Sequence, residues 1–298
     1  MYHLPVMLNE CLDALNISEG NTIVDVTFGG GGHSKAILER LTGGRLIAFD
    51  QDEDALQNTI VDERLTLVNQ NFKYLRQYLK FYNAAPVDAI LADLGVSSYQ
   101  FDTAHRGFST RFEGELDMRM NQATVKTAKS ILATYSEAAL QHMFSEYGEI
   151  RNSKTLAIAI TQARVEAAIN TTQDLKQAIK SCVSAAHANQ YYAQVFQALR
   201  IEVNDELDVL KDMLMQSAAV LKSGGRLVVM SYHSLEDRLV KNFISKGNFE
   251  GVDEKDFYGN RINVLFKSEN KKPVTASAEE LKTNPRSRSA KLRIAVKL

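Results

Sequence analysis

Four consecutive glycines, Gly29 to Gly32, stand between a short apolar run and a helix-like segment. The apolar run at residues 21–28 has the pattern of a buried strand, and residues 34–41 have that of a helix. A strand, a glycine turn and a helix start direct backbone N–H groups toward a polar ligand, and the missing Cβ atoms allow close approach. A tight turn that packs a helix against a strand could use the same residues, so the loop alone does not establish a binding site.

The first hundred residues continue this alternation of strands and helices. The expected strands are 21–28, 44–50, 66–69 and 87–93, and the expected helices are 34–41, 53–59 and 72–81. Strands separated by helices indicate an α/β fold with a parallel sheet, because parallel neighbours need a crossover connection. Such a sheet binds its ligands at the carboxyl ends of its strands.

After residue 93 the alternation stops, and a long stretch with helical periodicity follows. The helical segments are near 125–134, 137–147, 152–169 and 173–187. All four prolines lie outside this stretch, so no residue there forbids continuous helices. We therefore expect an all-helical domain at residues 104–200.

The sheet resumes near the end of the chain. The expected elements are a helix at 204–222, a Ser-Gly-Gly turn at 223–225, and strands at 226–231, 262–267 and 292–297. Residues 1–103 and 201–298 should thus form one α/β domain that carries the helical domain as an insertion.

Composition excludes several classes of protein. The chain has 298 residues, of which 45% are hydrophobic, enough to bury a large core. No apolar run approaches the roughly 18 residues needed to cross a bilayer, and no secretory signal pattern is present at the start, so we expect a cytoplasmic protein. Cys11 and Cys182 have no partner at metal-ligand spacing, so we expect no metal site. A net charge of −1 gives no overall basic signature for nucleic-acid binding.

A carboxylate follows the second expected strand, where nucleoside-binding sheets hold ribose hydroxyls. Asp50 lies about 20 residues beyond the glycine loop. Dinucleotides and S-adenosylmethionine share this arrangement. The dehydrogenase pattern G-x-G-x-x-G would need a third glycine at position 34, where this chain has Ser34. In addition, Asp25 stands at the end of the first strand. An acid at that strand end, with a Gly-Gly turn before a later apolar strand, favours a sulfonium cofactor.

Several motifs in order make the chain resemble a known family. They are V-D-V-T-F-G-G-G-G-H-S (24–34), A-D-L-G-V-S-S-Y-Q-F-D (92–102), R-G-F-S (106–109), L-D-M-R-M (116–120), Y-G-E (147–149), F-Q-A-L-R-I-E-V-N (196–204), S-Y-H-S-L-E-D-R (231–238) and N-P-R-S-R-S-A-K-L-R (284–293). On these residues the chain resembles the bacterial ribosomal RNA small-subunit methyltransferase H family, which methylates N4 of a cytidine in the decoding region of 16S rRNA. The likeness covers essentially the whole chain, starting with H-L-P-V-M-L-N-E at His3.

The resemblance implies a Rossmann-like class I methyltransferase sheet with an inserted all-helical domain that recognises RNA. It implies S-adenosyl-L-methionine as the cofactor, and 16S rRNA or the small ribosomal subunit as the partner. The cofactor contacts that it implies are Gly31, Gly32, His33, Asp50, Phe72, Asp93 and Gln100. The chain departs from the family pattern at Asn121 and at residues 189–194, both inside the expected insertion.

Two residues are candidates for the chemistry. Cytosine's exocyclic amine is a poor nucleophile because its lone pair is delocalised, so an oriented acceptor for its N–H would assist an in-line attack. Asp93, at the end of the 87–93 strand, could provide this acceptor or position the cofactor, and we favour the cofactor role. His233 follows the 226–231 strand and could act as a general base or fix the turn by hydrogen bonding.

Basic residues that could bind RNA gather near the C-terminus. Six lie between Leu281 and Leu298 without any acid: Lys282, Arg286, Arg288, Lys291, Arg293 and Lys297. Phosphate binding predicts RNA contacts for Arg286 and Arg288, although a solvated terminal strand would have the same composition. Arg106 and Arg119 could contact the target base, with Asp117 holding an arginine in place. N4 of a stacked cytosine is unreachable, so the target base must be unpaired or extruded.

Other functions fit parts of the sequence. An NAD-dependent oxidoreductase could use the same loop and Asp50. A non-catalytic ribosome-assembly factor could keep the cofactor fold and bind RNA through the basic C-terminal residues. Methylation of a small molecule suits a large insertion less well. The sequence leaves the oligomeric state open.

Overall fold

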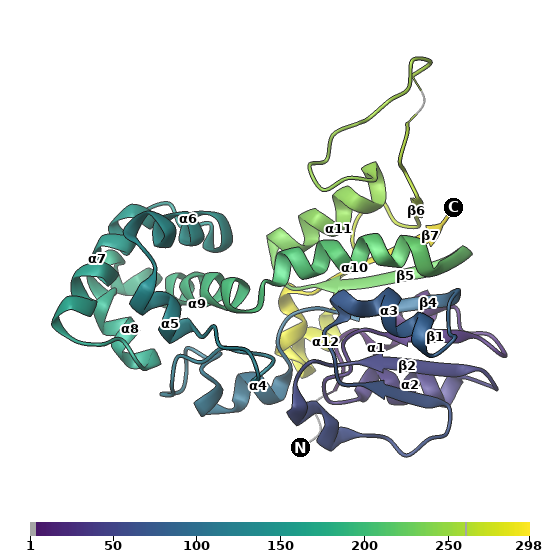
Figure 1. Ribbon diagram of the computed structural model, residues 1–298, viewed down its shortest axis with the longest axis horizontal. Helices are drawn as coiled ribbons and strands as arrows, with labels where there is room; N and C mark the ends of the chain where they lie inside the picture. Colours follow the sequence, from purple (N-terminus) through teal and green to yellow (C-terminus); the bar gives the residue numbers. More distant parts are fainter. Residues whose placement is uncertain (1–3, 260) are drawn as a thin grey trace. The chain divides into compact units, whose positions relative to one another are not determined.

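The computed structural model describes residues 4–259 and 261–298 (Figure 1), so His3 of the expected first motif lies outside the described residues. The chain forms two compact units. The sheet unit comprises the residues up to Gly95 together with Leu207–Leu298, and the helical unit comprises Val96–Glu206. The helical unit extends several residues beyond the expected 104–200 at both ends.

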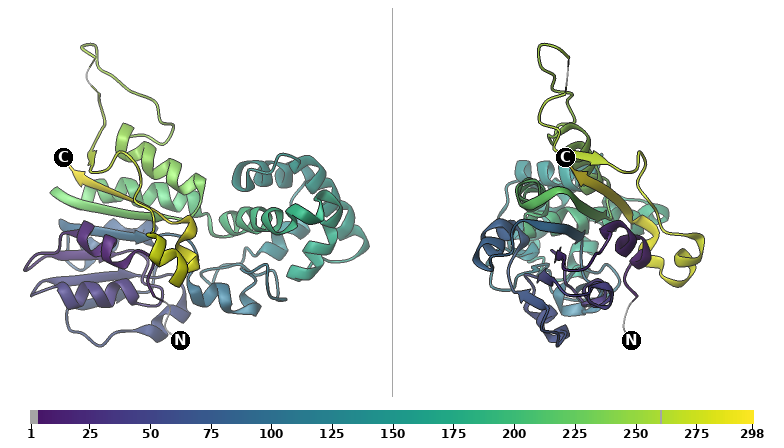
Figure 2. Two further views of the ribbon diagram at one scale, coloured as in Figure 1. Left: turned by 180° about the vertical axis from the view of Figure 1, so that it is seen from behind. Right: turned by 90° about the vertical axis from the view of Figure 1, so that its right-hand side faces the viewer.

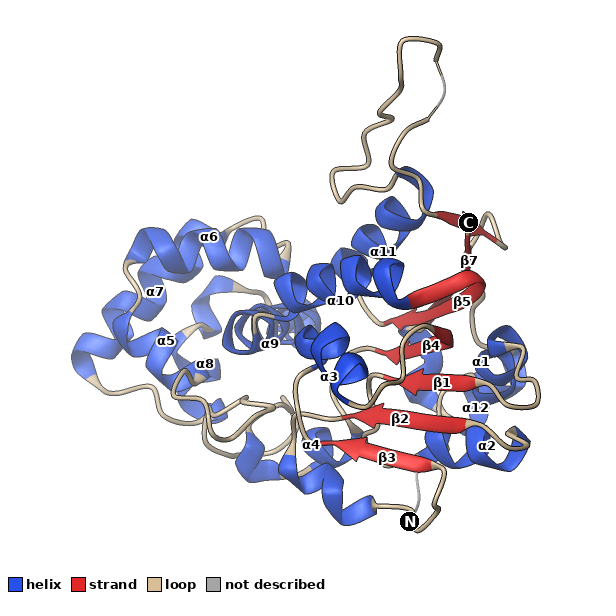
Figure 3. Cartoon of the chain, turned by 45° about the vertical axis from the view of Figure 1, so that its right-hand side comes forward, coloured by secondary structure: helices blue, strands red, loops and turns tan. Residues whose placement is uncertain are grey.

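Seven strands of the described residues form one sheet in the sheet unit (Figure 3). They are β1 (Thr22–Asp25), β2 (Arg45–Phe49), β3 (Leu65–Val68), β4 (Val87–Asp93), β5 (Leu221–Ser231), β6 (Phe266–Ser268) and β7 (Lys291–Lys297). Their order is β3-β2-β1-β4-β5-β7-β6. The first five strands are parallel, and β7 runs antiparallel to both β5 and β6. The predicted α/β, Rossmann-like sheet is therefore confirmed, and the carboxyl ends of β1, β2 and β4 lie at one edge.

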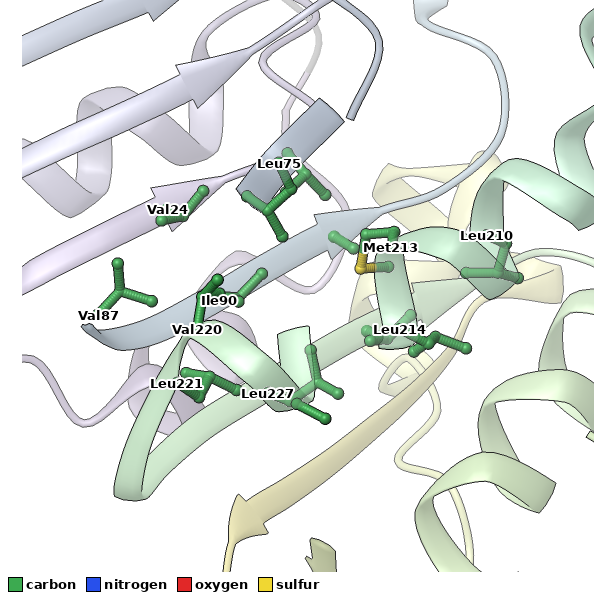
Figure 4. Close-up of a cluster of buried hydrophobic side chains, with 14 of the residues drawn as sticks. Val24, Leu75, Val87, Ile90, Leu210, Met213, Leu214, Val220, Leu221 and Leu227 are labelled. Carbon is green, nitrogen blue, oxygen red and sulfur yellow. The ribbon is translucent and has the colours of Figure 1, made fainter. Parts of the chain in front are cut away.

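Helices cover both faces of this sheet. Successive strand residues alternate between two apolar clusters, as in β1, where Val24 packs into one and Ile23 into the other. The cluster with Val24 contains side chains of α3 (Leu75–Phe81), α10 (Glu206–Val220) and α11 (Ser234–Lys246), and Figure 4 shows Leu75, Met213 and Leu214 in it. The cluster with Ile23 contains side chains of α1 (Leu8–Leu15) and α2 (Gly32–Arg40).

Several predicted elements differ in detail from those observed. The expected helix at 53–59 is the 3-10 helix η1 (Glu53–Asn58), and the one at 72–81 is η2 (Phe72–Tyr74) followed by α3. The expected turn at 223–225 is an irregularity in β5, where the pairing with β4 shifts register. The strand prediction for 262–267 is wrong, because β6 begins only at Phe266.

The last helical segments of the sheet unit precede β7. They are α12 (Ala278–Thr283) and the 3-10 helix η6 (Pro285–Ser289). Glu280 of α12 accepts a hydrogen bond from the Met7 N–H at 2.7 Å, and the amide of Asn284, between α12 and η6, donates to the Leu4 carbonyl at 3.1 Å. The two ends of the chain are therefore joined beside α1.

The helical unit, whose helices can be followed in Figure 2, has its own apolar core. Its helices are α4 (Ser98–Asp102), η3 (Ala104–Arg106), α5 (Ala128–Thr134), α6 (Glu137–Gly148), α7 (Ser153–Glu166), α8 (Thr172–Ala178), η4 (Lys180–Cys182), η5 (Ala185–His187) and α9 (Ala188–Asn204). The single helix expected at 173–187 is wrong, since α8 ends at Ala178. The Asn152 side-chain amide donates to the Cys182 carbonyl at 2.9 Å and thus satisfies a group that a continuing helix would have used.

Among residues 4–259 and 261–298, none of the helices combines the length and the apolar character that crossing a lipid bilayer requires.

Candidate functional site

Three carboxylates mark the carboxyl edge of the sheet. Asp25 is the last residue of β1, Asp93 is the last residue of β4, and Asp50 directly follows β2. Because these strands are neighbours and parallel, their ends bring the carboxylates toward one region. The sheet thus gathers negative charge at the edge where ligands bind in such folds.

Asp25 is fully buried and organises the loop after β1. Its carboxylate accepts hydrogen bonds from the Ser34 hydroxyl at 2.7 Å and from the Thr27 N–H at 3.1 Å. The Thr27 hydroxyl accepts in turn from the Asp93 N–H at 2.7 Å. Ser34, at the place of the third dehydrogenase glycine, therefore ties α2 to β1, and Thr27 links β1 to the end of β4.

The four glycines of the loop have different reasons for lacking a side chain. Gly29 and Gly31 have φ values of 52° and 73°, a conformation that other residues adopt only with strain. A Cβ on Gly32 would lie 2.4 Å from Cγ of Pro5. A Cβ on Gly30 would meet no atom within 4 Å. The fold itself thus requires three of these glycines, whereas a side chain at Gly30 would enter open space.

Asp50 is held rigidly beside this loop. One carboxylate oxygen accepts from the Gly29 N–H at 2.7 Å, and the other accepts from the Asp52 N–H at 2.8 Å. Burial raises the pKa of Asp50 to about 6, although these two backbone hydrogen bonds favour the ionised form. The position and orientation of the Asp50 carboxylate are therefore set by the backbone.

Asp93 lies between an aromatic hydroxyl and an imidazole. The Tyr232 hydroxyl donates to Oδ1 at 2.7 Å, and Nδ1 of His33 lies 3.7 Å from Oδ2. Burial raises the pKa of Asp93 to about 6, while His33 and the Tyr232 hydroxyl favour its ionised form. The side chain keeps 24% of its surface exposed, so a ligand can reach this carboxylate.

Geometry also fixes the tautomer of His33. Its Nε2 lies 3.1 Å from the Val6 carbonyl, which can only accept, so Nε2 carries a proton. In neutral His33, Nδ1 therefore presents a lone pair toward Oδ2 of Asp93.

His233, the second candidate for the chemistry, caps α11. Its Nδ1 accepts from the Glu236 N–H at 3.4 Å, while the Glu236 carboxylate accepts from the His233 N–H, also at 3.4 Å. Nε2 lies 3.2 Å from the Glu236 carboxylate, and both side chains are buried. This geometry favours the turn-fixing role over that of a general base.

The other expected cofactor contacts lie in both units. Phe72 begins η2 and is partly buried against the sheet unit's core. Gln100 belongs to the helical unit, where its side-chain oxygen accepts from the Ser97 N–H at 3.0 Å in the capping box of α4. The roles of Phe72 and Gln100 stay predictions from the family resemblance.

The C-terminal basic residues have different environments. Arg293 binds Asp237 of α11 through two hydrogen bonds of 2.6 and 3.1 Å, and Lys291 lies 3.5 Å from the same carboxylate. Arg286 and Arg288 lie on η6, where Arg286 is partly buried and Arg288 is exposed. Two of the six basic residues thus serve an intramolecular ion pair, and Arg288 offers its charge to solvent.

The expected RNA-contacting residues of the helical unit form an internal network. Arg106 is 2% exposed and donates to the carbonyls of Arg119 and Met120 at 2.8 and 3.4 Å. Asp117 holds the Arg119 guanidinium through two hydrogen bonds of 2.8 and 2.7 Å. Asp117 therefore does hold an arginine in place, while Arg106 has little surface left to reach a base.

Sequence reasoning missed Tyr232, Thr27 and Glu236 as parts of the site. Glu236 accepts from the Tyr232 N–H only four positions away, a pattern that carboxylates near helix starts often show, whereas the Thr27 hydroxyl accepts from the Asp93 N–H 66 positions away. Tyr232 stands in the S-Y-H-S-L-E-D-R motif, but its partner Asp93 is 139 positions away. No local pattern marks that contact.

Comparison with known proteins gives a consistent result. Residues 1–298 match the model of the family described as the MraW methylase family. A relative from Flavobacterium johnsoniae, named ribosomal RNA small subunit methyltransferase H, is 53% identical over 100% of this chain and 98% of its own. A protein of the same name from Azobacteroides pseudotrichonymphae is 54% identical with the same coverage. A solved rRNA methylase structure from Streptococcus thermophilus covers 100% of this chain and 99% of its own, at 14% identity and a TM-score of 0.42.

Proposed function

Because the chain belongs to the MraW methylase family, we propose that it transfers a methyl group from S-adenosyl-L-methionine to N4 of a cytidine in the decoding region of 16S ribosomal RNA. Relatives that are more than half identical over the whole chain carry the name of a small-subunit rRNA methyltransferase. The enzyme class and the cofactor follow from the family. The target atom rests on the motifs that the chain shares with that family.

The observation that carries the proposal is the group of carboxylates beside an open glycine. A sulfonium is a cation, so Asp25, Asp50 and Asp93 at the sheet edge suit it electrostatically. The space beside Gly30 would admit a ligand close to the backbone, and a Cβ there would partly fill it. The residues present therefore fit the cofactor.

Each part of the site has a distinct role in this function. Asp50, oriented by two backbone N–H groups, would accept hydrogen bonds from ribose hydroxyls. Gly31, Gly32 and His33 stand at the start of α2, where the first N–H groups of a helix have no partner within the helix, although the Gly31 N–H already donates to the Phe28 carbonyl at 2.8 Å. When bound, the cofactor supplies a methyl group on positively charged sulfur.

Asp93 is suited to accept the proton of the target amine. Its Oδ2 is the oxygen that the Tyr232 hydroxyl does not use, and the carboxylate is partly exposed. With a pKa of about 6 it is mostly ionised at neutral pH, so it can accept a hydrogen bond from the amine N–H and take the proton released on methyl transfer. We therefore propose that Asp93 positions both the cofactor and the target amine.

The remaining parts concern RNA. We propose that residues 104–200, in the helical unit, recognise the substrate and that Arg288 and Arg286 bind its phosphates. The target base would enter the site unpaired or extruded, because N4 is inaccessible in a stacked helix. The reaction would take place in the cytoplasm, where ribosomal subunits assemble.

A labelling experiment tests the proposal. The full-length protein is incubated with methyl-labelled cofactor and either small ribosomal subunits or naked 16S rRNA, and the modified nucleosides are identified by mass spectrometry. We expect N4-methylcytidine from at least one substrate, and none with Asp93→Asn. RNA binding without methyl incorporation would support the assembly-factor alternative, and protection against unfolding by NAD but not by S-adenosylmethionine would support the oxidoreductase.

A further inference from the structure

Tyr232 is placed against Asp93 by the pairing of β4 with β5. In that register Asp93 lies opposite Met230, and the Leu94 N–H donates to the Met230 carbonyl at 3.0 Å. Tyr232 follows two residues later, just beyond the end of β5. From there its hydroxyl reaches back to Oδ1 of Asp93 at 2.7 Å.

Further contacts hold Tyr232 in this position. Its backbone N–H donates to Oε2 of Glu236 at 2.9 Å, and Glu236 is itself only 2% exposed in the first turn of α11. A Cβ on Gly95 would lie 3.4 Å from the Tyr232 ring, an ordinary contact distance, so the ring lies alongside the backbone after β4, and it also packs against the apolar cluster with Ile23. The phenol is thus fixed at its backbone and along its ring.

The hydroxyl makes the two oxygens of Asp93 unequal. Oδ1 accepts from Tyr232, while Oδ2 faces His33 at 3.7 Å, a distance longer than a hydrogen bond. A carboxylate held at one oxygen cannot rotate freely about its last bond. Oδ2 is therefore presented in a constant direction.

We propose that Tyr232 is a positioning residue for the methyl-transfer reaction, whose hydroxyl holds the Asp93 carboxylate so that Oδ2 meets the target amine or the cofactor. This inference rests on the proposed function for its consequence in catalysis. Tyr232 itself acts only through Asp93. Its hydroxyl serves as a donor to the ionised carboxylate and releases no proton of its own, because burial and the neighbouring Asp93 keep its pKa well above the usual value.

The chain offers a matched control for the loss of such a bond. In the helical unit the Tyr135 hydroxyl donates to Oε1 of Glu202 at 2.6 Å. Tyr135→Phe and Tyr232→Phe each remove one phenol hydroxyl from a carboxylate and keep the ring. A purely structural role predicts similar behaviour of both variants, whereas positioning predicts an effect on Asp93 from Tyr232→Phe only.

The first experiment measures the Asp93 carboxylate directly in cofactor-free protein. Carbon-13 NMR of protein with labelled aspartate carboxyls gives the titration of Asp93, assigned by its absence in Asp93→Asn. We expect a titration near pH 6 in the wild type and a shift to higher pH in Tyr232→Phe, because a donor to the ionised form is lost. An unchanged titration in Tyr232→Phe would overturn the proposal, as would an equal shift in Tyr135→Phe.

The second experiment follows methyl transfer to RNA as a function of pH. Tyr232→Phe should lower kcat by about 10- to 100-fold with little change in KM for RNA. The acid limb of its pH–rate profile should move to higher pH by the same amount as the NMR titration of Asp93. In Tyr135→Phe the acid limb of the pH–rate profile should stay at its wild-type position. An unchanged kcat in Tyr232→Phe would refute the positioning role.

A reciprocal measurement covers the case in which Tyr232→Phe does not fold. Tyrosine labelled at Cζ reports the ionisation of Tyr232, and Asp93→Asn should lower its titration point because the neighbouring negative charge is removed. No change there would contradict the contact. If the wild type methylates no RNA, the proposed function fails, while both NMR titrations still decide whether the hydroxyl holds the carboxylate.

Discussion

Asp50 and Asp93 are the same residue type with the same raised pKa of about 6, yet their carboxylates are held by different groups. Both oxygens of Asp50 accept from backbone N–H groups, which cannot change from donor to acceptor. Asp93 faces a hydroxyl and an imidazole, and both can adapt to a neutral partner. Replacement by the isosteric amide should therefore have opposite effects at the two positions.

Asp93→Asn should stabilise the protein at alkaline pH. Between pH 3.8 and about 6 the folded wild type binds more protons at Asp93 than the unfolded chain does, so its stability contribution falls as pH rises through this window. The variant lacks this loss, so its free energy of unfolding should exceed that of the wild type by about 1–3 kcal/mol at pH 8. Urea denaturation at pH 8 and pH 4 measures this, and the difference should vanish at pH 4. Asp208→Asn, on the surface of α10, should show no such difference.

Asp50→Asn should destabilise the fold. The amide group would place an N–H₂ against the N–H of Gly29 or of Asp52, leaving one backbone donor unsatisfied. We expect a loss of about 1–3 kcal/mol in urea denaturation at pH 4, where the wild type does not yet suffer the alkaline loss of stability that the raised pKa of Asp50, about 6, causes at pH 8. A variant as stable as the wild type would mean that water replaces one of these hydrogen bonds.

Some site residues could be predicted from the sequence and others could not, because their positions depend on different features of the fold. Asp50 and Asp93 could be located because each ends an apolar run, and strand ends of a parallel sheet converge. Tyr232 could not, because its contact depends on the register between β4 and β5. The buried states of Arg106 and Arg293 escaped prediction for the same reason: their partners come from the three-dimensional fold.

At the scale of elements, the loop between β1 and α2 combines two requirements. Its turn needs the positive φ angles of Gly29 and Gly31, and its helix start packs against the N-terminal segment at Gly32. Gly30 is needed neither for a positive φ angle nor for packing against the N-terminal segment. The sequence shows four equal glycines, and only the structure separates those that build the loop from Gly30, where an added Cβ would meet open space.

Gly30→Ala and Gly32→Ala should therefore have separable effects. A methyl group at position 32 would collide with Pro5, so Gly32→Ala should lose about 1–3 kcal/mol of stability. Gly30→Ala should leave the stability of the free protein within about 0.5 kcal/mol. Thermal unfolding with and without S-adenosylmethionine checks this: Gly30→Ala should lose most of the cofactor-induced increase in Tm. If it keeps that increase, the cofactor does not approach Gly30.

Strands were easier to predict than the connections after them. The apolar runs of β1, β2 and β4 alternate between two cores, so burial alone determines them. β6 is short and pairs only with β7 at the edge of the sheet, so its bounds depend on that partner rather than on its own residues. In the interrupted segment after α8, the Cys182 carbonyl likewise has its partner in Asn152, which comes from another helix start.

At the scale of the whole molecule, charge decides how RNA can be bound. The formal net charge is −1, so long-range attraction to RNA is weak, and affinity must come from local contacts. Arg293 and Lys291 are engaged by Asp237, whereas Arg288 is exposed on η6. These basic residues are close in sequence but differ in role. Arg288 is free to bind RNA, whereas Lys291 and Arg293 hold α11 against β7.

Arg288→Ala and Arg293→Ala should separate these two uses of charge. Arg288→Ala should weaken RNA binding, make the slope of log K against log salt less negative by about 0.7–0.9, and leave the free energy of unfolding unchanged. Arg293→Ala should lose about 1–3 kcal/mol of stability, because it leaves the nearly buried Asp237 carboxylate with only the more distant Lys291. Filter binding to 16S rRNA fragments at several salt concentrations, together with urea denaturation, measures both effects. Lys211→Ala, on the exposed face of α10, is the matched control for the loss of a surface charge, and it should change neither the slope nor the stability by much. A salt slope unchanged by Arg288→Ala would remove η6 from the RNA-binding surface and leave the helical unit as the place to search for phosphate contacts.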